Sequence, residues 1–196
     1  IYDYLRLLYA RAGEAYSYTT GEKMVKYTEE KVVSMIQHDY AGKKILILAP
    51  LVRNRKGHYR ELFEQMRKKG YLYIRVDGEV KEIVRGMKVD RYKNHNIEVV
   101  VDRLKLGEMA EGTVDERLRQ SVSTAMKQGE GLVMILDNDT NEAKFFSKRL
   151  MDPVSGLSYK DPAPNIFSFN SPEGACQRCQ GMGRVSVIDI DKVIPD

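Results

Sequence analysis

The spacing of apolar residues between positions 43 and 137 changes from segment to segment, and this alternation constrains the fold more than any other feature. Ile45–Leu48 is a continuous apolar run, which is typical of a buried strand. Apolar residues in 59–66 are instead three and four positions apart, as in an amphipathic helix, and Gly70 is a natural stop. Apolar and polar residues alternate over 72–76, which predicts a half-exposed strand.

Further elements follow, each marked by a turn signal, a capping signal or its own periodicity. They are the Asp77-Gly78 hairpin turn, a short strand at 79–84, an alternating strand at 97–101, a helix capped by Thr113 and Glu116, and an apolar strand at Leu132–Leu136. The resulting order β-α-β-β-β-α-β is close to a split β-α-β arrangement with one extra short strand. We therefore expect an α+β fold with a mixed, mainly antiparallel sheet and helices on one face.

The residues on either side of this central region show other sequence patterns. Residues 2–12 form an amphipathic pattern, Thr28 can cap a second helix, and prolines cluster between 152 and 172. The chain starts at Ile1 inside a helical pattern, so we expect a piece of a longer protein. Three parts are predicted: a helical segment at 1–40, an α+β domain at 41–145, and an extended connector with a cysteine pair at 146–196.

Positive charge is concentrated in one stretch. The net charge of the chain is +4. Residues 41–60 carry six Lys and Arg and no Asp or Glu, so the net charge of all other residues together is −2. Cations beside a helix N-terminus oppose the helix dipole, and an anionic partner would account for them better than folding does. The alternative is a basic loop that is simply exposed to solvent. A guanidinium group can form paired hydrogen bonds with the carboxylates of a protein or with the phosphates of DNA, so the residues do not say which partner binds. The candidate partner-binding residues are Arg53, Arg55, Lys56 and Arg60 in an expected loop, with Arg75, Asp77 and Glu79 as neighbours.

The cysteines form one C-x-x-C motif, Cys176 and Cys179, followed by Gly181 and Gly183. Such a turn lets two thiolates bind one zinc ion, but a structural zinc site needs four ligands. The second pair would have to lie outside this chain. A redox pair and a chaperone-type zinc repeat are weaker alternatives, because no strand precedes the motif and only one copy is present. Two cysteines make no disulfide framework, which favours a cytoplasmic protein.

Catalytic and membrane functions find little support. No G-x-x-x-x-G-K-[ST] phosphate-binding loop is present, and no nucleophile–base pair can be defended, so we do not expect an enzyme. Acidic residues such as Asp77, Glu79 and Asp102 are interpreted as turn and strand-edge charges. No apolar run approaches the roughly 18 residues that a membrane span needs.

Several separate blocks, in order and at suitable spacing, resemble the UvrA family of nucleotide-excision-repair ATPases. They are Ile1–Gly13, Ile47–Pro50, Arg55–Gly57, Val99–Arg103 and Phe167–Cys176. The resemblance spans essentially the whole chain, and several blocks in register are more specific than any single motif.

This resemblance implies the part of the parent that docks UvrB, the next protein of the excinuclease pathway. The parent would be a homodimeric, ABC-type ATPase that binds DNA, with its ATP and magnesium sites outside this chain. The Cys176/Cys179 pair would be half of a zinc module. A DNA-binding module that uses the basic loop 53–60 is the alternative function.

The chain departs from the family in one respect. Many members carry another zinc site, with cysteines in stretches that correspond here to residues 13–18 and 149–153. Neither stretch contains a cysteine. We expect apolar and tyrosine contacts to hold this junction instead.

Overall fold

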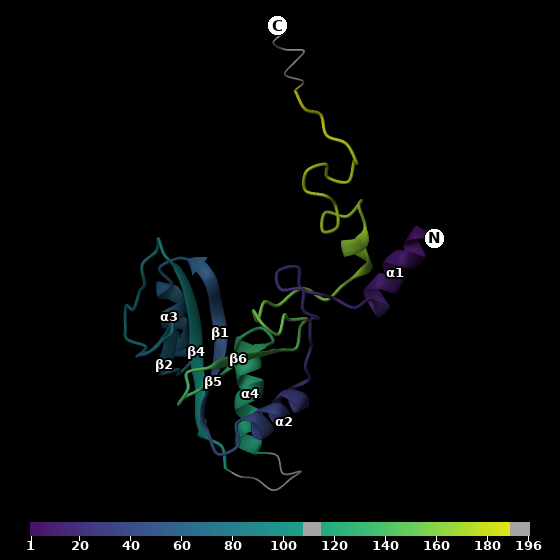
Figure 1. The fold of residues 1–196 in the computed structure, drawn as a ribbon. Helices are drawn as coiled ribbons and strands as arrows, with labels where there is room; N and C mark the ends of the chain where they lie inside the picture. Colours follow the sequence, from purple (N-terminus) through teal and green to yellow (C-terminus); the bar gives the residue numbers. More distant parts are fainter. Residues whose placement is uncertain (108–114, 189–196) are drawn as a thin grey trace. The chain divides into compact units, whose positions relative to one another are not determined.

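The computed structural model describes residues 1–107 and 115–188, which belong to two compact units. The sheet unit comprises residues 16–159, and the other unit combines residues 1–15 with the chain from Lys160 onward (Figure 1). These units differ from the expected division at 40/41 and 145/146. Helix α2 packs against α4, and strand β6 completes the sheet, so the segments on both sides of the expected central domain belong with it.

The predicted order β-α-β-β-β-α-β is confirmed from β1 to β5. The elements in chain order are α1 (Tyr2–Ala12), α2 (Glu29–Asp39), β1 (Lys44–Lys56), α3 (Arg60–Lys68), β2 (Tyr73–Val76), β3 (Glu79–Glu82), β4 (Asn94–Lys105), α4 (Glu116–Gln128), β5 (Leu132–Asp137), β6 (Ala143–Ser147) and the 3₁₀ helix η1 (Pro164–Phe167). Strand β6 was not predicted, and η1 interrupts the expected extended connector.

The sheet has six strands in the order β3-β2-β4-β1-β5-β6. Each hydrogen-bonded pair of described strands is antiparallel, so the parallel pairing that a mixed sheet implies was a wrong expectation. Strands β1 and β2 nevertheless point the same way with β4 between them, and β4 and β5 do so with β1 between them. Two split β-α-β units therefore interlock, and the α+β class is confirmed.

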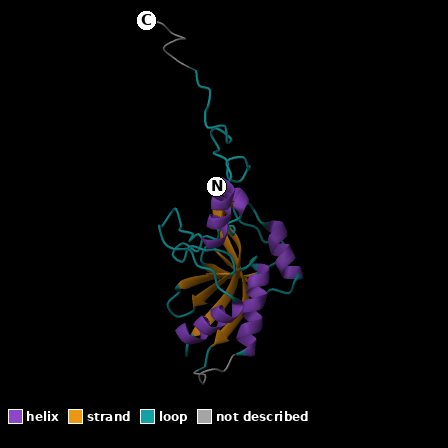
Figure 2. Ribbon diagram, turned by 90° about the vertical axis from the view of Figure 1, so that its right-hand side faces the viewer, coloured by secondary structure: helices purple, strands orange, loops and turns teal. Residues whose placement is uncertain are grey.

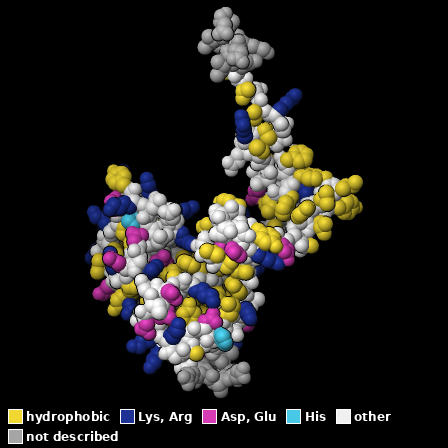
Figure 3. Space-filling model, viewed as in Figure 1, with side chains coloured by type: hydrophobic (Ala, Val, Ile, Leu, Met, Phe, Trp, Pro, Cys, Tyr) yellow, Lys and Arg dark blue, Asp and Glu magenta, His cyan; other side chains and the backbone are white. Residues whose placement is uncertain are grey.

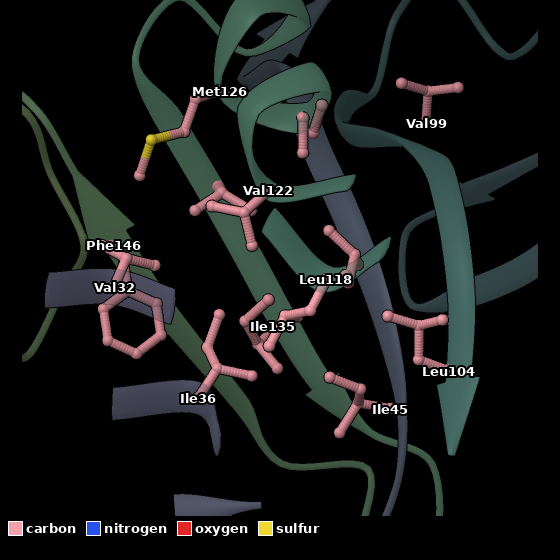
Figure 4. Close-up of a cluster of buried hydrophobic side chains, with 14 of the residues drawn as sticks. Val32, Ile36, Ile45, Val99, Leu104, Leu118, Val122, Met126, Ile135 and Phe146 are labelled. Carbon is pink, nitrogen blue, oxygen red and sulfur yellow. The ribbon is translucent and has the colours of Figure 1, made fainter. Parts of the chain in front are cut away.

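One face of the sheet is covered by helices. Leu118, Val122 and Met126 of α4 are buried against Ile45 and Ile135 of the sheet (Figure 4). Helices α2 and α3 add Val32, Val33, Ile36, Phe63 and Met66 to the same apolar cluster. Figure 2 shows the strands and the helices beside them. Each fully buried side chain of this size contributes about 1.5–3 kcal/mol, so this layer is the main source of stability.

The opposite face has no helix among the described elements. Its apolar side chains form a separate buried cluster of Leu46, Leu48, Val100, Met134 and Leu136, with Phe145 at its margin. The loop at 152–157 approaches this margin, because a Cβ built on Gly156 would lie 2.8 Å from the ring of Phe145. The prediction of helices on one face is therefore confirmed.

Two local signals can be compared with the structure. The Asp77-Gly78 turn is confirmed, with φ of 50° at Asp77 and 94° at Gly78, as a type I′ hairpin requires. Helix α4 is capped differently from the prediction, since the Asp115 side chain accepts a hydrogen bond from the Leu118 N–H at 3.1 Å. Glu116 is the first helical residue, and Thr113 lies outside the described residues.

The segments that carry the chain into and out of the sheet unit meet at a buried carboxylate. Asp152 accepts hydrogen bonds from the hydroxyls of Ser17 at 2.7 Å, Thr20 at 2.8 Å and Ser155 at 2.8 Å. Tyr18 and Tyr159 add an edge-to-face contact nearby. The expectation of apolar and tyrosine contacts at this junction was thus incomplete, because a polar centre ties the two segments together.

Candidate functional site

The expected basic loop is largely part of strand β1. Arg55 lies opposite His95 of β4, and Lys56 lies opposite Asn94. Only residues 57–59 separate the strand from α3. The loop prediction was wrong because β4 begins at Asn94, three residues before its apolar pattern starts, and so offers a hydrogen-bonding partner to the charged end of β1.

A β-bulge near this end separates Arg53 from Arg55. Val52 pairs with Ile97 and Arg55 with His95, so Arg53 and Asn54 together face one residue of β4. Asn54 has φ of 48°, and its N–H donates to the Asn96 side chain at 2.9 Å. Without the extra residue the two arginines would point to the same side. The bulge places Arg55 on the helix-covered side and Arg53 on the opposite side.

Arg53 is engaged inside the sheet unit. Its guanidinium donates to the backbone carbonyls of Ser155, at 3.0 Å, and Gly156. The same group lies 4.9 Å from the centre of the Phe145 ring. Burial lowers the pKa of Arg53, and the carboxylate of Glu98 opposes that shift. These contacts hold the guanidinium inside the sheet unit, where it is less accessible to a partner.

Arg75 is also engaged internally. Its side chain is only 14% exposed and forms an ion pair of 3.3 Å with Glu98, whose side chain is 6% exposed. Burial raises the pKa of Glu98, while the charge of Arg75 acts against this shift. Removing either partner would leave a buried charge uncompensated. The pair is therefore part of the interior of the helix-free face.

The two acidic candidates form local contacts at the β2–β3 hairpin. Asp77 accepts hydrogen bonds from His95 at 2.6 Å and from the Asn96 N–H at 2.8 Å. Glu79 is exposed and pairs with Lys81 at 2.8 Å. The hairpin lies at the same end of the sheet as Arg55, because Val76 pairs with Ile97 of β4. Asp77 therefore lies near Arg55, because His95 contacts Asp77 and pairs with Arg55 in the sheet.

Arg55, Lys56 and Arg60 are the candidates whose charge is available. All three side chains are exposed, and none forms an ion pair within the described part of the chain. Arg60 begins helix α3, where a positive charge opposes the helix dipole. The charge of these three side chains is therefore open to solvent.

A second basic segment, missed in the sequence, lies beside the first. Lys88, Arg91 and Lys93 are exposed in the loop that leads into β4. The Val89 N–H donates to the His58 carbonyl at 3.1 Å, which joins this loop to the turn before α3. We call Arg55, Lys56, Arg60, Lys88, Arg91 and Lys93 the cationic end. Figure 3 shows Lys and Arg side chains gathered at the end of the sheet where β1 terminates in Figure 1.

His95 joins the two segments of the cationic end. It is 5% exposed, and its ring nitrogens lie 2.6 Å from the Asp77 carboxylate and 2.7 Å from the Asp90 carbonyl. Both neighbours are acceptors, so the doubly protonated imidazolium satisfies them best. The Asp77 carboxylate raises the pKa of His95, with a further contribution from the Asp90 carbonyl. His95 is thus a buried residue of β4, although it stands in a polar stretch of the sequence.

A groove of about 730 Å³ runs beside the part of β1 that lies beyond its pairing with β5, and it includes Arg55. Leu51, Tyr59, Leu62 and Leu157 supply apolar surface to it. Its charged lining residues are Arg53, Arg55, Lys69, Glu130 and Arg149. Positive charge therefore continues from the cationic end along this groove.

The cysteine pair adopts a tight turn in the other unit. Backbone N–H groups of Cys179 and Arg178 donate to the Cys176 sulfur and lower the pKa of its thiol. Gly181 has φ of 90°, and a Cβ there would lie 2.2 Å from a backbone oxygen, so glycine is required. This geometry suits two thiolate ligands of zinc. The described residues contain no group of three or more side chains that could hold a metal ion.

No helix in the described residues is long and apolar enough to cross a membrane.

Known proteins of similar sequence match this chain from end to end. Residues 28–139 match a family model described as the UvrA interaction domain. The chain is 41% identical over 197 residues to the UvrABC system protein A of Methanothermobacter thermautotrophicus. It is 40% identical to that of Staphylococcus aureus and 38% identical to that of Thermus thermophilus, each over 196 residues. These matches cover 99–100% of this chain but 20% of each relative.

Proposed function

Because the chain belongs to the UvrA family, we propose that its sheet unit docks UvrB through the cationic end. The domain name points to an interaction module, and the charge distribution supports a particular place on it. Six exposed cations from two segments share one end of the sheet, with His95 holding those segments together. Such a surface fits an acidic face of a protein partner. Charge complementarity of this kind mainly speeds association and selects the partner.

The seven residues first considered have different roles in this proposal. Arg55, Lys56 and Arg60 would contact the partner directly. Arg53 and Arg75 would act through the fold, because their guanidinium groups are engaged internally. Asp77 would act through His95, and Glu79 is exposed at the edge strand, where it could accept a cation of the partner.

Paired charge reversals test the proposal. In the 196-residue chain, Arg55→Glu with Lys56→Glu should weaken binding to purified UvrB by about tenfold or more, mostly through slower association. The matched control is Lys44→Glu with Lys105→Glu, which reverses two exposed lysines at the opposite ends of the same two strands. Equal loss in both double variants would show a general charge effect and contradict a local docking surface.

DNA binding through the same cations is the competing function. Phosphate contacts release counterions, so the affinity of a DNA-binding surface falls steeply with salt. Binding of this chain to duplex DNA should therefore be measured at several salt concentrations alongside UvrB binding. A steep salt slope for DNA that disappears in the Arg55/Lys56 variant, with UvrB binding unchanged, would favour the DNA function.

For the whole protein we propose the role of its family. It would be a cytoplasmic, homodimeric ATPase of nucleotide excision repair that binds DNA and delivers it to UvrB. Its ATP and magnesium sites would lie outside this chain. Cys176 and Cys179 would provide two zinc ligands, with the remaining ligands supplied by another part of the parent.

A further inference from the structure

One aromatic side chain projects from the cationic end. Tyr92 is 70% exposed, and the guanidinium of Arg91 lies 4.7 Å from the centre of its ring. A single exposed apolar residue is common on protein surfaces and does not by itself mark a site. The loop that presents Tyr92 is therefore the informative feature.

The backbone around Tyr92 is held by several hydrogen bonds. The Tyr92 N–H donates to the Asp90 side chain at 3.0 Å, and the Lys93 N–H donates to the Asp90 carbonyl at 3.3 Å. His95 donates to the same carbonyl at 2.7 Å. The tyrosine is thus presented by a fixed turn, and little conformational entropy would be lost when it binds.

The surroundings of the ring define the partner. Tyrosine and arginine are the residue types most often found at interface hot spots, where an aromatic side chain fills a pocket and other contacts exclude water. Lys88 and Lys93 flank the ring in the sequence, and both are exposed. We propose that Tyr92, with Arg91 stacked on it, is the anchor of the docking surface and inserts into an apolar pocket bordered by carboxylates on UvrB. This inference rests on the proposed function and assigns a residue to it.

A protein pocket fits these observations better than a nucleic acid does. Single-stranded nucleic acids bind along successive aromatic side chains, each offering a free face to a base. Arg91 already stacks on the ring of Tyr92. The cations would then pair with carboxylates around the pocket, which gives the interface both an apolar centre and a charged rim.

The test is a binding series with the 196-residue chain and purified UvrB. Tyr92→Ala should raise Kd by about 10–30-fold, as expected for a hot spot, whereas Tyr92→Phe should stay within about threefold because the ring is kept. Tyr18→Ala is the matched control, since Tyr18 is 85% exposed in the same unit but does not belong to the cationic end. It should change Kd by less than about twofold. Thermal unfolding of each variant verifies that the sheet unit is intact.

The outcomes separate this inference from the proposed function. If Tyr92→Ala binds normally while Arg55→Glu with Lys56→Glu binds weakly, the docking surface stands and the anchor is wrong. If neither variant affects UvrB binding, both ideas fail. Loss of binding to a single-stranded oligonucleotide without loss of UvrB binding would overturn the inference in favour of nucleic-acid stacking.

Discussion

Arg53 and Arg55 should respond in opposite ways to replacement by alanine, although only one residue separates them. Arg53 donates two charge-assisted hydrogen bonds to backbone carbonyls and stacks on Phe145. Hydrogen bonds to charged groups contribute about 1.5–3 kcal/mol each, and a cation–π contact adds about 0.5–1 kcal/mol. Ordering a long side chain costs up to about 2 kcal/mol, which leaves a net contribution of about 1.5–5 kcal/mol. Arg53 is only half-buried, so solvent screens these contacts, and the expected loss for Arg53→Ala is in the lower part of that range, about 2–3 kcal/mol.

A loss of this size should be visible in thermal unfolding. For a unit of this length, Arg53→Ala should lower Tm by about 5–10 °C in calorimetry or circular dichroism. Arg55 is exposed and forms no ion pair within the described chain, so Arg55→Ala should change stability by less than about 0.5 kcal/mol. Below its Tm, the Arg53 variant should still bind UvrB. Equal Tm values for the two variants, or a larger loss for Arg55→Ala, would refute the bulge-based assignment of their roles.

Three further changes test other parts of the structure. His95 has a raised pKa, so its stabilisation of the β4 loop is complete below its ordinary value of 6.5 and is lost as pH rises through the raised value. The protection of this loop against hydrogen exchange, relative to the intrinsic base-catalysed rate at each pH, should therefore fall on that rise, and His95→Gln should abolish this fall. Gly156→Ala should lower the free energy of unfolding of the sheet unit by about 2–3 kcal/mol in denaturant titration, because the new Cβ meets the Phe145 ring. Gly86→Ala is the control: its Cβ would have open space, so the free energy of unfolding should fall by only about 1–2 kcal/mol, owing to the positive φ. Asp152→Ala should lower the Tm of the sheet unit, because the hydroxyls of Ser17, Thr20 and Ser155 lose their shared acceptor. Residues near the junction should then be cleaved faster in limited proteolysis. Unchanged cleavage would contradict the role of Asp152 in holding the two segments together.

Most elements of this fold could be predicted because their signals are local. The alternation of apolar residues over 97–101, the turn at Asp77-Gly78 and the Thr28 cap each depend on neighbours a few positions away. Strand β6 was missed because its five residues include only two bulky apolar side chains, Phe145 and Phe146. It becomes a strand by pairing with β5, whose edge it covers.

The docking surface remains a prediction, and the structure changes which cations belong to it. The excess of positive charge in residues 41–60 indicated one end of the sheet as a candidate. The contribution of Lys88, Arg91 and Lys93 was overlooked, although four cations against one acid in residues 85–93 could have indicated it. That loop joins the surface through His95, and no local pattern shows that this histidine is buried.

The sequence by itself determined the order of elements from β1 to β5, the family, and the presence of a basic stretch, since periodicity, composition and short matching blocks are properties of neighbouring residues. The tertiary structure decided which charges are available. A bulge at Asn54, whose N–H is held by Asn96 of another strand, turns Arg53 towards Phe145 and leaves Arg55 exposed. These partners lie about 40 to 100 positions away along the chain. The direction of a charged side chain depends on such distant contacts, and only the folded chain brings them together.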